Sequence, residues 1–141
     1  EEVLDEALGL GPLEALLADK DISEIMVNGF GNIFFEKKGL INRSSITFTA
    51  NQQLHNIIQR IVMPLGRQIN SKTPFVDARL PDGSRVHAII EPLAIDGPAL
   101  TIRKFKKDAF GEEQYIQYGS STRQMMVFLK LAVEYGCNII I

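Results

Sequence analysis

"ARLPDGSRVHA", residues 78–88, predicts a tight β-hairpin whose turn decides how the neighbouring strands are oriented. Pro81 suits the second position of a type I turn, and Asp82 suits the third. Gly83 suits the left-handed residue that completes a G1 bulge. The stretch therefore predicts two antiparallel strands joined by a three-residue loop.

This loop sets the register of the two strands. With three residues in the loop, Arg79 lies opposite Arg85, and the strands present one apolar face and one polar face. A two-residue loop at residues 82–83 would mix Arg85 with apolar residues, so the cleaner segregation favours the first register. The apolar face then carries Val76, Ala78, Val86 and Ala88, and the polar face carries Asp77, Arg79, Arg85 and His87.

A third strand adds another arginine to the polar face. "ALTIRKF", residues 99–105, alternates so that Arg103 shares the polar face with Thr101. Like charges opposite each other destabilise a sheet. One interpretation is a phosphate-like anion between the guanidinium groups, whose fork of donors matches phosphate oxygens. The other is that these arginines solvate the wet face of the sheet, with Asp77 neutralising one of them diagonally.

The remaining pattern predicts an α+β fold. We expect a predominantly antiparallel sheet of five or six strands with flanking helices and a helix near the C-terminus. Expected strands span 22–28, 33–41 with a turn at 37–39, 74–80, 84–90 and 99–105, and expected helices span 1–8, 12–19, 49–67, 112–118 and 120–137.

Two of the helices carry more detailed predictions. In the 49–67 helix, Thr49 and Gln52 form a predicted capping box, and Pro64 disturbs the last turn. In the 120–137 helix, the apolar spacing predicts a buried face. That face carries Met126, Leu129 and Val133, with Met125 and Ala132 beside them.

Composition excludes several classes of function. The 141 residues carry a formal net charge of −2, so the chain as a whole is not a basic nucleic-acid binder. One cysteine and two histidines make a poor metal set. No apolar run approaches the roughly 20 residues that span a bilayer. The sequence contains no Walker A glycine loop and no nucleophile motif, and His87 is expected to be a surface residue of the hairpin.

One alternative function remains open. "RKFKK", residues 103–107, is a basic stretch with an interleaved aromatic residue, a pattern seen in nucleic-acid binding. The chain would then be a non-enzymatic interaction module that binds nucleic acid or an acidic partner through this strand. A solvated strand end explains the same residues.

Several segments of the sequence resemble a known family. "VDARLPDGSRV" (76–86) together with "TIRKF" (101–105) and "FLKLAVEYGCNIII" (128–141) is similar to pilus-assembly and secretion ATPases of the CpaF/TadA type, within the type II/type IV secretion ATPase superfamily. The stretch 8–29 is similar as well. Relatives often have Pro-Pro where this chain has Glu91-Pro92, and they carry acidic residues near 69–72.

The resemblance implies a domain of a hexameric ring protein. Residues 1–108 would be a PAS-like N-terminal domain, 109–137 a linker and helix, and 138–141 the first strand of a RecA-like ATPase domain. ATP and Mg²⁺ would bind in the full-length parent. Without a P-loop, residues 1–141 alone should not hydrolyse ATP and should hold no cofactor.

The resemblance also implies a role for the arginines. Arg85 and Arg103 would approach the terminal phosphates of the nucleotide, with Arg79 as a further neighbour. No catalytic residue and no metal site are expected within these residues. The expected partners are five further copies in a homohexamer and inner-membrane secretion or pilus platform proteins, at the cytoplasmic side of that membrane, with no nucleic acid.

Overall fold

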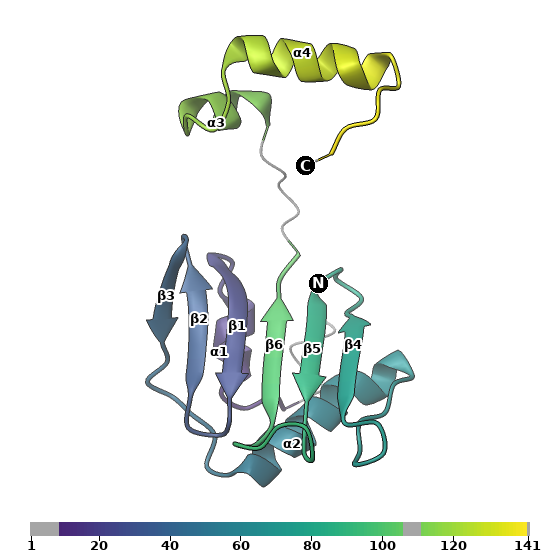
Figure 1. Ribbon diagram of the computed structural model, residues 1–141. Helices are drawn as coiled ribbons and strands as arrows, with labels where there is room; N and C mark the ends of the chain where they lie inside the picture. Colours follow the sequence, from purple (N-terminus) through teal and green to yellow (C-terminus); the bar gives the residue numbers. More distant parts are fainter. Residues whose placement is uncertain (1–8, 106–110, 141) are drawn as a thin grey trace. The chain divides into compact units, whose positions relative to one another are not determined.

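The chain forms two compact units, Glu1–Phe105 and Lys106–Ile141 (Figure 1). The computed structural model describes residues 9–105 and 111–140. The helix predicted for 1–8 and the predicted domain boundary at residue 108 lie outside the described residues, so the division into 1–108, 109–137 and 138–141 stays a prediction. Among the described residues, no helix is both long enough and apolar enough to cross a bilayer.

The described residues of the first unit form a six-stranded antiparallel sheet with two helices, which confirms the predicted α+β fold (Figure 1). The strand order is β3-β2-β1-β6-β5-β4, so the last strand in sequence lies in the middle of the sheet. In chain order the elements are α1 (Leu13–Ala18), β1 (Ile22–Asn28), β2 (Ile33–Lys37), β3 (Leu40–Arg43), α2 (Asn51–Val62), a 3₁₀ turn (Met63–Leu65), β4 (Phe75–Arg79), β5 (Arg85–Ile89) and β6 (Ala99–Arg103).

The core lies between one face of the sheet and the two helices. Strand side chains alternate between faces, so each of the central strands sends every second residue into the core. The buried residues include Ile25, Val86 and Ile102 from the sheet and Leu54 and Ile58 from α2. Burial of this apolar surface is the main source of the unit's stability. The opposite face is not covered by α1 or α2 and is called the open face below (Figure 1).

The ends of α2 show how local chemistry sets the helix. The predicted capping box between Thr49 and Gln52 is wrong, because the helix begins at Asn51 and its N-cap is Ala50. The side-chain oxygen of Gln53 instead accepts hydrogen bonds from the backbone N–H and hydroxyl of Thr49, at 2.9 and 3.0 Å. At the other end Pro64 lies in the 3₁₀ turn, as its effect on the last turn predicted.

The second unit contains helices α3 (Glu112–Gln117) and α4 (Arg123–Glu134). Arg123 pairs with Glu113 at 3.0 Å and joins the two helices. The predicted buried face of α4 is wrong for the described chain: none of its residues is buried, and Leu129 and Val133 are 40% and 67% exposed. The apolar spacing identified an amphipathic helix, but the described residues of this unit do not cover its apolar side. Residues 138–140 have no strand assignment and residue 141 lies outside the described residues, so the expected strand at 138–141 stays a prediction.

Candidate functional site

The hairpin turn between β4 and β5 has the predicted geometry. The N–H of Leu80 donates to the carbonyl of Ser84 at 2.7 Å, and the N–H of Gly83 donates to the carbonyl of Leu80 at 2.9 Å. Gly83 has a φ of 90°, a conformation that favours glycine. Arg79 therefore pairs with Arg85, which confirms the register predicted from the loop.

The same register continues across the sheet and produces a row of charged residues on the open face. Arg85 pairs with Arg103, Arg103 pairs with Glu24, and Glu24 pairs with Glu36. In strand order β4-β5-β6-β1-β2, the row is Arg79, Arg85, Arg103, Glu24 and Glu36, and it is called the charged row below. Three arginines on adjacent strands are followed by two glutamates.

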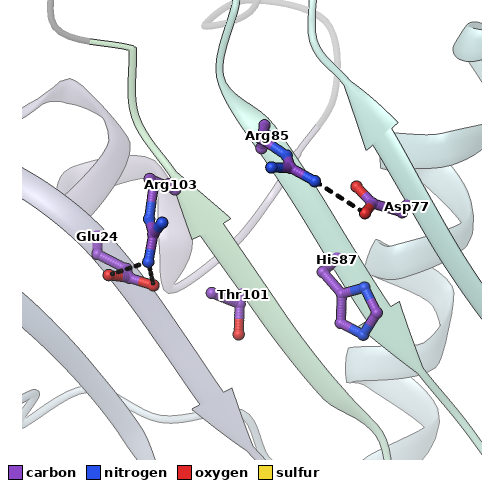
Figure 2. Close-up of a pocket in the computed structure, with 6 residues that line it drawn as sticks. All are labelled: Glu24, Asp77, Arg85, His87, Thr101 and Arg103. Atoms are coloured by element: carbon purple, nitrogen blue, oxygen red, sulfur yellow. Dashed lines mark hydrogen bonds and ion pairs between the residues drawn. The ribbon is translucent and has the colours of Figure 1, made fainter. Parts of the chain in front are cut away.

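Each of the two central arginines has a carboxylate on the strand beyond it. Arg85 Nη2 lies 3.0 Å from Asp77 Oδ2, which is the diagonal pairing considered from the sequence. Arg103 Nη2 lies 3.3 and 3.4 Å from the two carboxylate oxygens of Glu24. Figure 2 shows Asp77 and Glu24 on the outer sides of the two arginines. These pairs offset the repulsion between adjacent guanidinium groups.

The arginines and their carboxylates surround an open depression with a volume of about 220 Å³. The side chains of Arg85 and Arg103 remain 62% and 69% exposed despite their ion pairs. Arg79 lies in the same row, but it does not line the depression. The lining residues are Glu24, Asp77, Arg85, His87, Thr101 and Arg103 (Figure 2).

Of two further lining residues, His87 and Glu24, the sequence predicted the position of the first and not that of the second. His87 is exposed on the open face, as predicted for a surface residue of the hairpin. Glu24 was not predicted as part of the site, because it lies 79 residues before Arg103 in the chain. Its alternation within strand 22–28 places it on one face, but the pairing of β1 with β6 is a property of the whole fold.

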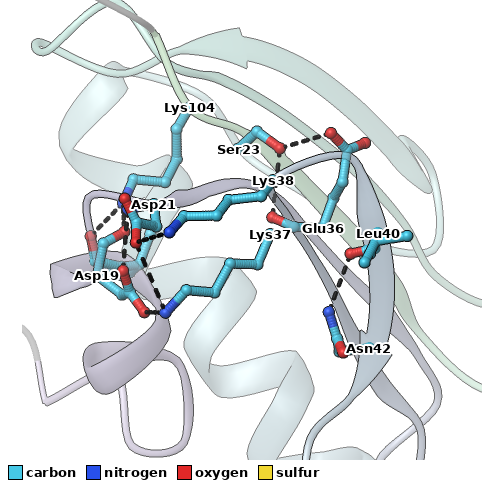
Figure 3. Close-up of polar contacts among 10 residues, drawn as sticks. Asp19, Asp21, Ser23, Glu36, Lys37, Lys38, Leu40, Asn42 and Lys104 are labelled. Atoms are coloured by element: carbon cyan, nitrogen blue, oxygen red, sulfur yellow. Dashed lines mark hydrogen bonds and ion pairs between the residues drawn. The ribbon is translucent and has the colours of Figure 1, made fainter.

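The basic stretch at 103–107 has structural partners. The ammonium group of Lys104 donates to the carbonyl oxygens of Leu17 and Asp19, both at 2.7 Å, at the C-terminal end of α1 (Figure 3). Burial lowers the pKa of Lys104. Arg103 pairs with Glu24, and Lys106 and Lys107 lie outside the described residues. Two of the cations on which the interaction-module alternative depends thus have partners inside the domain.

A second group of charges surrounds the end of α1. Lys37 pairs with Asp19 at 2.7 Å, and Asp19 also accepts the N–H of Asp21 at 2.9 Å (Figure 3). The hydrogen bond from Lys37 lowers the pKa of Asp19, and the same bond raises the pKa of Lys37. Asp19, Lys37 and Lys104 are called the α1 cluster below. Within the described residues, no group of three histidine, cysteine or acidic side chains is arranged to hold a metal ion.

Comparison with known proteins identifies the family. The family described as type II/IV secretion system protein matches residues 6–141. The chain belongs to this family. It is 38% identical over 127 residues to uncharacterized protein MJ0781 of Methanocaldococcus jannaschii, covering 89% of this chain and 18% of that protein. It is 26% identical over 140 residues to the probable conjugal transfer protein TrbB of Sinorhizobium fredii, covering 98% of this chain and 42% of that protein.

Solved structures agree with this family. The crystal structure of the VirB11 ATPase from the Brucella suis type IV secretion system, in complex with sulphate, matches with a TM-score of 0.68 and 25% identity. The match covers 88% of this chain and 42% of the VirB11 chain, and the sheet and its helices correspond to the N-terminal domain. This chain therefore spans less than half the length of the relatives described here.

Proposed function

We propose that this chain is the N-terminal domain of a secretion or pilus-assembly ATPase and that Arg85 and Arg103 bind the terminal phosphate of its nucleotide. One observation carries the proposal: in a member of a secretion family, these two guanidinium groups border the same depression on the open face of the sheet. Arg79, the next residue of the charged row, is a further candidate for contact with the phosphates.

The chemistry of the site favours a tetrahedral oxyanion. Arginine presents a planar fork of donors that matches two phosphate oxygens at once. The arginine side chains of both ion pairs are exposed, and ion pairs with exposed side chains contribute only about 0–1 kcal/mol each. A hydrogen bond to a charged group contributes about 1.5–3 kcal/mol. The VirB11 ATPase structure is a complex with sulphate, an anion of the same shape as a phosphate.

In the full-length protein the rest of the nucleotide and its Mg²⁺ would be held outside these residues. The described residues offer no metal cluster, and the 141-residue sequence has no Walker A loop. Binding of ATP draws the arginines toward the terminal phosphate and brings the two domains together. Hydrolysis removes that anchor and lets them separate, which is a hinge-type switch.

The wider assembly follows from the same proposal. The domain works in a homohexameric ring at the cytoplasmic side of the inner membrane, bound to platform proteins of a secretion or pilus system. We assign the narrower CpaF/TadA type on the sequence resemblance alone.

The test is ATP turnover by the full-length protein. Arg85→Ala and Arg103→Ala are each expected to lower turnover by about 30- to 1,000-fold, the equivalent of about 2–4 kcal/mol. Arg43→Ala is the matched control. Arg43 lies on the same open face, but on the edge strand β3, where it donates to Asn32 at 3.0 Å. Normal turnover and nucleotide affinity in both test variants would contradict the proposal.

A further inference from the structure

We propose that Glu24 and Asp77 are built-in competitors of the terminal phosphate. They hold Arg103 and Arg85 when no phosphate is present, and they release the arginines when it binds. The two carboxylates thereby set how strongly the domain distinguishes a nucleoside triphosphate from a diphosphate. This inference rests on the proposed function, and it names two specificity-determining residues that the arginine positions alone do not reveal.

The arrangement of the strands is the first argument. Arg85 and Arg103 are on the neighbouring strands β5 and β6, while Asp77 is on β4 and Glu24 is on β1. Each carboxylate therefore draws its arginine toward the neighbouring strand β1 or β4 and away from the other arginine (Figure 2). A phosphate between β5 and β6 would draw both guanidinium groups inward, so the two arrangements exclude each other.

The geometry of the ion pairs is the second argument. Charge-assisted N–H···O bonds are typically about 2.7–2.9 Å long. Arg103 reaches both oxygens of Glu24 through one nitrogen at 3.3 and 3.4 Å, and Arg85 reaches one oxygen of Asp77 at 3.0 Å. Neither is the two-nitrogen fork that makes an arginine–carboxylate pair strong. A ligand that engages two nitrogens of an arginine can therefore displace the carboxylate from it.

The charge balance is the third argument. Two arginines and two carboxylates line the depression, so their formal charges cancel when His87 is neutral. A weakly charged anion gains little from such a site, because it must compete with a carboxylate at each arginine. A terminal phosphate carries enough charge and enough oxygens to replace both partners. The carboxylates therefore weaken the binding of a terminal phosphate without preventing it, and they do not affect a diphosphate, which lacks that phosphate.

The two carboxylates differ in burial, which predicts different effects. The side chain of Glu24 is only 19% exposed, while that of Asp77 is 52% exposed. Water can replace the arginine at Asp77 more readily than at Glu24. Losing Arg103 leaves Glu24 partly desolvated and without its ion pair, which opposes phosphate binding. Neutralising Glu24 should therefore have the larger effect.

The experiment measures the affinities of the full-length protein for ADP and for a non-hydrolysable ATP analogue, and uses their ratio as the readout. Glu24→Gln is expected to raise the preference for the triphosphate by roughly three- to fivefold, and Asp77→Asn by about twofold. Glu36→Gln is the matched control, because Glu36 is the next member of the charged row but accepts its hydrogen bond from Ser23 at 2.8 Å. Its ratio should stay at the parent value.

Combined variants separate this inference from the proposed function. The gain from Glu24→Gln should disappear in combination with Arg103→Ala and persist in combination with Arg85→Ala. The gain from Asp77→Asn should disappear with Arg85→Ala and persist with Arg103→Ala. An unchanged or lowered ratio in both carboxylate variants would overturn the competition, and a lowered ratio would mean that the carboxylates orient the arginines for phosphate. If Arg85→Ala and Arg103→Ala leave the parent ratio unchanged, the proposed function itself fails. Should Glu24→Gln not fold, the exposed Asp77→Asn variant decides the question alone.

Discussion

The charged row and the α1 cluster both combine cationic and acidic side chains, but their contacts differ in length and in partner (Figures 2 and 3). In the α1 cluster, Lys104 donates to two carbonyl oxygens at 2.7 Å, and Lys37 reaches Asp19 at the same distance. In the charged row, the contacts of Arg85 and Arg103 are longer, at 3.0–3.4 Å, and each uses one nitrogen. Short bonds to backbone carbonyls fix a structure, whereas longer ion pairs of exposed arginines can exchange partners.

The difference indicates which charges serve the fold and which serve a ligand. Lys104 donates to the carbonyl of Leu17, one of the last carbonyls of α1, which have no partner within the helix, and it adds a second donor to the carbonyl of Asp19, which also accepts the N–H of Ile22 at 3.2 Å. The arginines of the charged row support no backbone group among the described contacts. The following predictions test this contrast, beginning with the largest expected effect.

Lys104→Met should lower the free energy of unfolding by about 1–3 kcal/mol, because it removes two charge-assisted hydrogen bonds while keeping an apolar stem of similar length. The measurement is urea denaturation of the 141-residue chain. The preference for triphosphate in the full-length protein should not change. Unaltered stability would mean that the α1 cluster is as dispensable as the charged row.

Gly83→Ala should lower the free energy of unfolding by about 1–2 kcal/mol. Gly83 has a φ of 90°, and an added Cβ would lie 3.1 Å from the ring of Phe105. The effect would show that the turn stabilises the hairpin in which Arg79 lies opposite Arg85. Gly39→Ala provides a control, since Gly39 also has a positive φ of 79° but open space around its Cβ position. Equal losses in the two variants would mean that the close approach of the added Cβ to Phe105 costs nothing beyond the strain of the positive φ.

The pH dependence of stability should report on the α1 cluster. The pKa of Asp19 is lowered in the folded domain, so its contribution is present above its ordinary value of 3.8 and is lost as the pH falls through the lower folded value. The pKa of Lys37 is raised, so its contribution is present below 10.5 and is lost above the raised value. Denaturation of Asp19→Asn across the acid range should show a weaker loss than the parent shows. An identical acid profile would contradict this assignment.

Arg85→Gln and Arg103→Gln should change the free energy of unfolding by no more than about 0.5–1 kcal/mol each. Both arginine side chains are exposed, and each substitution also removes repulsion from a neighbouring arginine. The same denaturation measurement applies. A loss as large as that of Lys104→Met would indicate that the charged row is a structural device.

The sequence predicted local features well and long-range partners poorly. The hairpin register followed from Pro81, Asp82 and Gly83, because a turn is determined by residues adjacent in the chain. The α2 cap was placed one residue too early, at Thr49 with Gln52, because several nearby polar residues could satisfy the same N–H groups. The ion pair of Glu24 with Arg103 was not predictable, since the pairing of β1 with β6 depends on how the whole sheet assembles.

The affinities of the full-length Arg85→Ala/Arg103→Ala double variant for ADP and for the ATP analogue test the central claim most directly. If the two guanidinium groups contact the terminal phosphate, affinity for the analogue should fall by at least about tenfold, while affinity for ADP stays within about twofold of the parent. Equal losses for both nucleotides, or no loss for either, would contradict the claim that these arginines recognise the phosphate that ATP has and ADP lacks.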